Sequence, residues 1–296
     1  MASRRTAAAV TLLILATGGA VYGSYLWSES APTPPPGEQC TVALGESSDT
    51  LSAEQAANAA LIAAASARLE MPARAATIGI ATALQESSLR NIDHGDRDSL
   101  GLFQQRPSQG WGTVEQILDP YYSTDTFYAA LGGVDGWQDM EVTVAAQTVQ
   151  RSGFPDAYAT REASARLWAS ALRGHSGVLA VTCDVSAGSG TTAQDFAARV
   201  DRDFGAGAYA VEVASATSEA IWLSVSGADA TANDAFAAWA VAVAREESVA
   251  TVAVDDAGWQ QGEGLTTVEV PRPGDGVAVR LTPLAGEAQS LSDSGT

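Results

Sequence analysis

The chain has 296 residues, of which 46% are hydrophobic, 35 are acidic and 16 are basic, so its formal net charge is −19. This length is enough for two domains, because compact domains usually contain roughly 100–200 residues. The negative charge disfavours nucleic acid and anionic membrane surfaces as partners, because both reward clustered lysine and arginine, and it predicts a well-solvated surface.

An apolar segment lies at the N-terminus. After Arg4 and Arg5 the chain runs without charge from Thr6 to Ser28, which is near the roughly 20 residues that span a bilayer, and the arginines favour a cytoplasmic N-terminus. We expect residues 1–28 to be either a transmembrane anchor or a cleaved signal peptide. The rest of the chain would then lie outside the cytoplasm, held at the cell membrane as a single-pass protein or secreted if the segment is cleaved.

Residues 29–50 contain a cluster of prolines that predicts an extended, semi-rigid linker. The chain has two cysteines, Cys40 and Cys183. An even number of cysteines in an exported protein usually means pairing, so we expect a disulfide between them. Since the chain also has only two histidines, a zinc site built from cysteine and histidine and a Ser-His-Asp triad are both disfavoured.

Residues 51–184 have the pattern of a mainly helical domain. Ser52 with Gln55, and Thr113 with Gln116, have the spacing of capping boxes, which mark helix starts. Apolar residues at helical spacing follow both starts and recur later in this range. Helices are expected at about 52–69, 72–87, 113–119, 123–131, 142–149 and 156–173.

A different pattern begins after a small-residue linker of the flexible kind at 185–192. Residues 193–284 predict a small α+β domain of unknown role, and 285–296 a disordered tail. The fold class is therefore α+β, a mainly α-helical domain followed by a smaller mixed one. In the second domain we expect helices at 193–204 and 233–245 and strands at 209–213, 221–225, 249–254, 266–270 and 277–281.

Glu86 is the candidate catalytic residue. It lies at the end of the helix expected at 72–87, and Gly79, Thr82 and Ala83 on the same face are small, so we expect them to form the floor of a groove. A carboxyl group beside apolar residues and at the negative end of a helix is poorly stabilised as an anion, so its pKa should rise. A general acid needs such a pKa, although a glutamate at a helix end is more often simply solvated.

Two motifs in this domain carry a resemblance: Glu86-Ser87 and Leu100-Gly101-Leu102-Phe103-Gln104. Together they resemble the Glu-Ser and Gly-Leu-Met-Gln signature of lysozyme-like lytic transglycosylases of the SLT type. The longer segment 95–112 is similar to lysozyme-like domains of actinobacterial secreted proteins and phage tail lysins. The resemblance covers about residues 51–175 and implies that 51–184 is a lysozyme-like catalytic domain that cleaves peptidoglycan glycan strands without a metal or other cofactor.

The resemblance also implies roles for single residues. Glu86 corresponds to the single catalytic acid/base, and Gln104 to the glutamine that lines the sugar groove. Trp111 stands between glycines, where its ring either stacks on a sugar or covers the core. The candidate substrate-binding residues are Ser87, Gln104, Gln105, Trp111 and Tyr158.

The chain departs from the family at a later Ala-Tyr-Asn motif, whose tyrosine holds the catalytic glutamate. Gln147, Gln150 and Tyr158 are the candidates to replace that tyrosine. The departure keeps open a second reading, a wall-binding or envelope-assembly protein that has the groove without turnover. No residue identifies a protein partner.

The reaction type depends on a second carboxylate. Hydrolytic glycosidases use two carboxyl groups, and Asp93, Asp96 and Asp98 are the candidates for the second. If one of them faces the groove, a muramidase that uses water is favoured. If none does, a lytic transglycosylase is favoured.

Overall fold

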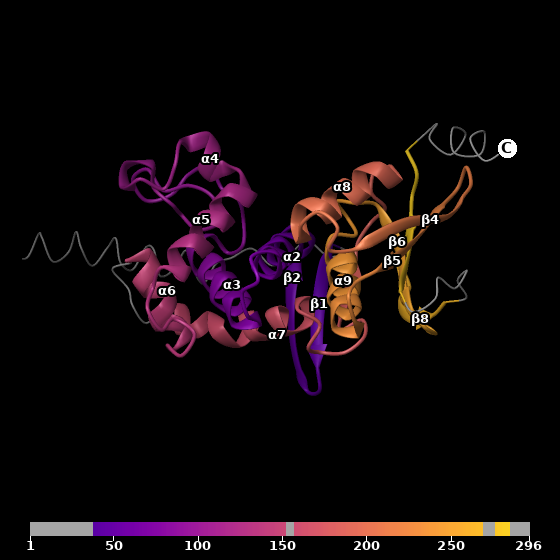
Figure 1. Cartoon of the computed structure of the whole chain (residues 1–296), viewed down its shortest axis with the longest axis horizontal. Helices are drawn as coiled ribbons and strands as arrows, with labels where there is room; N and C mark the ends of the chain where they lie inside the picture. Colours follow the sequence, from indigo (N-terminus) through magenta and orange to yellow (C-terminus); the bar gives the residue numbers. More distant parts are fainter. Residues whose placement is uncertain (1–37, 152–156, 269–275, 285–296) are drawn as a thin grey trace, which may run out of the picture. The chain divides into compact units, whose positions relative to one another are not determined.

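The structure, a computed structural model, describes residues 38–151, 157–268 and 276–284 (Figure 1). The expected N-terminal segment at 1–28 and the expected tail at 285–296 lie outside the described residues. Among the residues that are described, no helix combines the length and the apolar character needed to cross a bilayer. The first half is largely helical and the C-terminal part contains a six-stranded antiparallel sheet, so the α+β fold class is confirmed.

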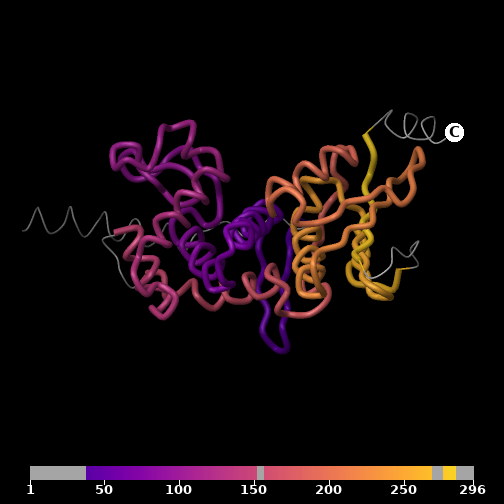
Figure 2. The backbone as a smooth tube through the Cα atoms, in the orientation of Figure 1, coloured from indigo at the N-terminus to yellow at the C-terminus, as the bar shows by residue number. Residues whose placement is uncertain are grey.

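A small antiparallel sheet brings the two ends of the helical half together. It consists of β1 (Gln39–Leu44), β2 (Ser47–Ser52) and β3 (Val181–Asp184), in the order β2-β1-β3. Cys40 on β1 lies directly opposite Cys183 on β3 and is joined to it by a disulfide, as the sequence predicted. In Figure 2 the β1–β2 hairpin is the indigo loop at the beginning of the described chain.

The hairpin corrects the expected linker at 29–50, because most of the described part of that range is β-strand. Cys40 and Val42 alternate with more exposed neighbours on β1, so one face of the strand is buried. Gly45 makes the turn to β2 with a φ of 60°, a conformation that glycine adopts without strain. The nearby prolines gave the range the composition of a spacer and obscured this short alternation.

The helices of the first half follow the expected order. Ser52 and Thr113 cap α2 and α4 with the predicted capping boxes, and Asp119 caps α5. The elements are α2 (Ala53–Arg68), α3 (Ala73–Ser87), the 3-10 helix η1 (Pro107–Gln109), α4 (Val114–Leu118), α5 (Pro120–Gly132), α6 (Val142–Gln150), the 3-10 helix η2 (Ala157–Arg161) and α7 (Glu162–Leu172).

Helix α3 is the central helix of this half and contacts α2, α5, α6 and α7. The small residues that precede Glu86 on α3 do not form the floor of a groove, because Thr82 and Ala83 are fully buried. A Cβ atom at Gly79 would lie 2.7 Å from the hydroxyl oxygen of Tyr128 and 2.9 Å from a methyl carbon of Ile62. Small side chains at these positions therefore allow α2 and α5 to approach α3 closely.

The C-terminal part is an antiparallel sheet with two helices. Strand β7 was not expected from the sequence, and α9 contacts the central strands β6 and β9. The sheet order is β4-β5-β9-β6-β7-β8. The elements are α8 (Ala193–Phe204), β4 (Ala210–Ala216), β5 (Ile221–Ser226), α9 (Ala230–Ala242), β6 (Val249–Val254), β7 (Ala257–Gln260), β8 (Gly264–Thr267) and β9 (Val277–Leu281).

A buried carboxylate connects this part to the helical half. Asp203 of α8 accepts hydrogen bonds from the hydroxyl of Tyr121 at 2.6 Å, from the indole Nε1 of Trp239 at 2.7 Å and from Nε of Arg199 at 2.9 Å. Its side chain is inaccessible to solvent. Because three donors satisfy this carboxylate and one of them belongs to α5, it fastens α8 and α9 to the helical half.

The segment expected as a flexible linker at 185–192 is held in place. The amide of Gly190 donates to the hydroxyl of Ser248 at 3.0 Å, and the amide of Thr191 donates to the carbonyl of Thr282 at 3.0 Å. The small residues of this segment therefore permit close packing against the C-terminal part. The described residues all belong to one compact unit.

Candidate functional site

The last turn of α3 places Glu86 beside a loop that returns to the helix. The hydroxyl of Ser87 donates to the carbonyl of Leu102 at 2.7 Å, with the carbonyl of Ala83 at 3.1 Å as its other acceptor. Ser88 then ends the helix in the left-handed conformation. Ser87 is buried, so in this structure it fixes the loop against α3, and its hydroxyl is engaged within the protein.

Glu86 is held by a tyrosine from a distant part of the sequence. The hydroxyl of Tyr158, on η2, donates to Oε1 of Glu86 at 2.5 Å, and the Tyr158 side chain is completely buried. A hydroxyl that donates to a carboxylate forms a short, strong hydrogen bond and stabilises the anion. Of the three side chains considered as substitutes for the missing family tyrosine, Tyr158 is the one with a phenol hydroxyl on Glu86.

A glutamine supports the same carboxyl group. Gln150, the last residue of α6, donates its side-chain amide to the carbonyl of Phe103 at 2.7 Å and also forms a hydrogen bond with the Glu86 side chain. Glu86 is thus held from α6 and from η2. Both donors favour its charged form.

Burial has the larger effect on the pKa of Glu86. Loss of solvation raises the pKa, while the hydrogen bonds from Tyr158 and Gln150 lower it by a smaller amount, so that the net pKa lies above the ordinary value of a glutamate. The sequence predicted this direction. A raised pKa keeps more of the carboxyl group protonated near neutral pH, as proton donation requires.

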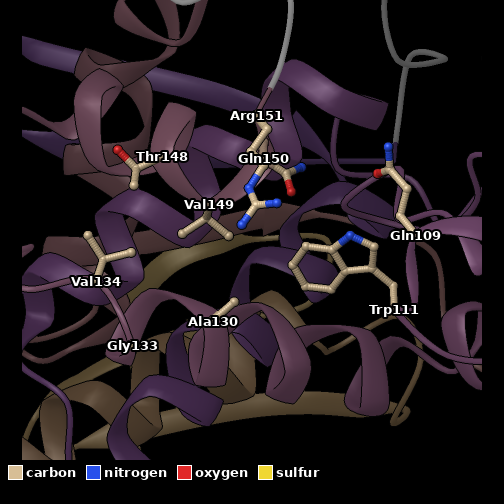
Figure 3. Close-up of a pocket in the computed structure, with 9 residues that line it drawn as sticks. All are labelled: Gln109, Trp111, Ala130, Gly133, Val134, Thr148, Val149, Gln150 and Arg151. Carbon is tan, nitrogen blue, oxygen red and sulfur yellow. The ribbon is translucent and has the colours of Figure 1, made fainter.

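A pocket of about 540 Å³ has Gln150 in its wall (Figure 3). Gln150 is also a hydrogen-bond partner of Glu86, so this side chain connects the pocket wall with the carboxyl group. The walls come from the loop after η1 and from the C-terminal ends of α5 and α6. The lining residues are Gln109, Trp111, Ala130, Gly133, Val134, Thr148, Val149, Gln150 and Arg151.

Trp111 covers part of the hydrophobic core, which was one of the two expectations for its ring, and it also lines the pocket. Gln109 and Arg151, which sequence reasoning did not select, line the same pocket. Gln109 lies within the segment 95–112, and the sequence signal for Arg151 is its position next to Gln150.

The neighbouring residues Gln104 and Gln105 lie in different surroundings. Gln104 has a φ of 47°, is partly buried, and donates its amide towards the carbonyls of His94 and Gly101, both at 3.3 Å. Gln105 is 1% exposed and donates to the carbonyl of Ser123 on α5 at 2.9 Å. The structure therefore places Gln105 in the interior, where it connects the loop to α5, and neither glutamine lines the pocket beside Trp111.

The candidate second carboxylates have partners within their own loop. Asp98 accepts from Nε of Arg106 at 2.7 Å and from the amide of Ser108 at 2.9 Å, and these donors hold the pKa of Asp98 well below its usual range. Asp93 is exposed and bonded to His94 at 3.0 Å. In the described parts of the chain, no group of three or more His, Cys, Asp or Glu side chains is arranged to hold a metal ion.

Comparison with known proteins adds no assignment. No protein-family model matches the sequence, and a search of the curated proteins gives no match. The resemblance to lysozyme-like domains therefore rests on the sequence motifs around Glu86 and Gln104.

Proposed function

We propose that this chain cleaves the glycan strands of peptidoglycan at the cell envelope, as a lytic transglycosylase or a muramidase, with Glu86 as the general acid and base. One observation carries the proposal. Glu86 is a partly buried carboxyl group with a raised pKa, it accepts a 2.5 Å hydrogen bond from Tyr158, and its other partner, Gln150, lines a pocket.

The chemistry follows from a single carboxyl group used twice. Protonated Glu86 gives its proton to the glycosidic oxygen as the bond between that oxygen and the anomeric carbon breaks. The resulting carboxylate then takes a proton from the hydroxyl that attacks the anomeric carbon. If that hydroxyl belongs to the muramic acid ring itself, the product is an anhydro sugar, and if it belongs to water, the product is a reducing end.

The surroundings of Asp98 support the transglycosylase form of this reaction. A hydrolase needs a second carboxylate about 5–9.5 Å from the first, and Asp98 is already bonded to Arg106 and Ser108 within its loop. In the proposed mechanism Tyr158 and Gln150 hold the carboxyl group of Glu86 in place while it changes between its protonated and charged forms.

The proposed action at the cell envelope agrees with the presence of the disulfide. Cys40 and Cys183 are joined, which indicates an extracytoplasmic folded domain. We propose that residues 1–28 deliver the chain there, as a membrane anchor or as a signal peptide that is removed.

The second candidate is a protein that binds the wall without cleaving it. The departure at the Ala-Tyr-Asn motif favours it, since the family tyrosine has no equivalent at that position in the sequence. The discriminating experiment incubates the purified full-length chain with cell-wall sacculi and measures soluble glycan release over time. Release that Glu86→Gln abolishes, while Glu115→Gln on the exposed helix α4 preserves it, supports cleavage. Binding to sacculi with no release by any of these proteins supports the second candidate.

A further inference from the structure

We propose that Arg151 binds a carboxylate carried by the sugar whose ring stacks on Trp111, so that the pocket is a subsite for an acidic sugar. This inference rests on the proposed function and deepens it, because it names the feature of the glycan that the site selects. A muramic acid residue offers one of two sources of such a carboxylate: its own lactyl group where no peptide is attached, or the acidic peptide where the lactyl carboxyl forms the amide bond to it.

The guanidinium group of Arg151 lies at the pocket. Arg151 follows α6, is exposed and points into the pocket from the side opposite Trp111 (Figure 3). Among the described residues, no carboxylate forms an ion pair with Arg151, whereas Arg106 and Arg199 each pair with one or more carboxylates. In a chain with 35 acidic and 16 basic residues, an arginine at a pocket that forms no ion pair with the described residues is a ready partner for an external anion.

Two other walls of the pocket carry partial negative charge. Gly133 lies at the C-terminal end of α5, and Val149 and Gln150 lie at that of α6, so the partial negative ends of two helices face this space. These ends disfavour an anion elsewhere in the pocket and offer carbonyl groups to sugar hydroxyls. The guanidinium group of Arg151 is therefore the favoured place for a carboxylate, and the hydroxyl groups of the sugar ring would donate to carbonyl oxygens.

Trp111 and Arg151 would contact different parts of the sugar. The partly exposed indole of Trp111 supplies a flat apolar surface for a sugar ring, whatever charge the sugar carries. Trp111 should thus recognise the ring and Arg151 the acid. The two contributions can be measured separately.

The backbone at Arg151 provides a variant that keeps the fold. Arg151 has a φ of 50°, in the left-handed region that asparagine tolerates better than most residues. Arg151→Asn therefore removes the guanidinium without new backbone strain, and Arg151→Lys retains the charge but loses the paired donors. Arg97, also exposed and with a φ of 59°, lies outside the pocket lining and supplies the matched control Arg97→Asn.

The test measures binding by calorimetry with the full-length chain carrying Glu86→Gln, so that no probe is consumed. The probes are glycan fragments with free lactyl carboxylates, the same fragments with these groups converted to neutral amides, and fragments that retain their peptides. We expect the acid form to bind about tenfold more tightly than the amide, because a charge-assisted hydrogen bond is worth about that factor. Arg151→Asn should remove this preference, Arg151→Lys should retain part of it, and Arg97→Asn should leave it unchanged.

The outcomes separate the inference from the proposed function. Equal binding of acid and amide forms by the parent protein, or an equal loss for both forms in Arg151→Asn, overturns the inference while Glu86-dependent release from sacculi still supports cleavage. Selective binding of the acid form without release supports the inference and contradicts cleavage. Binding of the peptide-bearing fragments that is as tight as that of the free acid or tighter, and that depends on Arg151, assigns the carboxylate to the peptide. Binding as weak as that of the neutral amide assigns it to the lactyl group, because the lactyl carboxyl of a peptide-bearing fragment is itself an amide. Trp111→Ala should weaken acid and amide forms by the same factor.

Discussion

The hydroxyl of Tyr158 donates a hydrogen bond to Oε1 of Glu86 at 2.5 Å, across a separation of 72 residues in the sequence. This contact joins η2 to the end of α3 and fixes the carboxyl group beside Gln150, which lines the pocket. Burial raises the pKa of that carboxyl group and the tyrosine opposes part of the rise. The pair therefore controls both the position and the protonation of the proposed catalytic group.

Tyr158→Phe should shift the pH dependence of glycan release. Removing the hydroxyl removes a donor that favours the anion, so the pKa of Glu86 rises further and the alkaline limb of the rate profile moves to higher pH. The maximum rate should fall about tenfold, because one hydrogen bond to a charged group is lost. A pH–rate profile of both proteins checks this. Tyr209→Phe, which loses a hydroxyl bonded to the carbonyl of Ala232, is the control that should leave the profile in place.

Glu86→Gln should be at least as stable as the natural chain near pH 7. The pKa of Glu86 is raised on folding, so the folded state binds the proton more tightly than the unfolded chain, and stability falls as pH rises from about 4.3, the ordinary value, through the folded pKa. The neutral amide avoids this loss. Thermal melting from pH 4 to 8 should show a difference that favours Glu86→Gln at high pH and shrinks as pH falls. A constant difference across this range would contradict the account.

The disulfide should contribute substantially to stability. Cys40 and Cys183 close a loop with a sequence separation of 143, and restraint of so long a loop in the unfolded chain is worth about 2–5 kcal/mol. The double variant Cys40→Ser with Cys183→Ser should lose this amount in urea denaturation. Adding a reductant should weaken the natural chain and leave the double variant unchanged.

Asp203→Ala should destabilise the chain by about 3–5 kcal/mol, because it leaves Arg199 without its buried partner and Tyr121 and Trp239 without their acceptor. Asp125→Ala removes an ion pair with Arg68 that is 2.6 Å long but partly exposed, and should cost about 0–1 kcal/mol. Urea denaturation compares the two. Similar losses for both would show that the buried carboxylate is not what fastens α8 to the helical half.

Local signals in the sequence were sufficient for most of the helices. The capping boxes at Ser52 and Thr113 give the starts of α2 and α4, because the bonds that define them lie within four residues. Strand β3 was missed because it is short and its partner β1 is more than 100 residues distant in the sequence, although Cys40 and Cys183 were paired correctly. Strands β1 and β2 were missed because the nearby prolines obscured their short alternation.

Part of the candidate site was also predictable from local signals in the sequence. Glu86 and the direction of its pKa shift follow from its motif and its helix. Tyr158 was one of three alternatives, since only tertiary packing brings η2 to α3. Gln105 and the small face of α3 were misplaced because a motif does not tell whether a side chain points into the core or into a groove.

The proposed function depends most directly on the chemical ends that the chain leaves on the glycan. Sacculi incubated with the natural chain, or with Glu86→Gln, would be analysed by mass spectrometry of the released muropeptides. The account predicts muropeptides whose release requires Glu86, with anhydro ends for a lytic transglycosylase or reducing ends for a muramidase. Equal release by both proteins, or release by neither, would contradict the assignment of Glu86 as the catalytic acid.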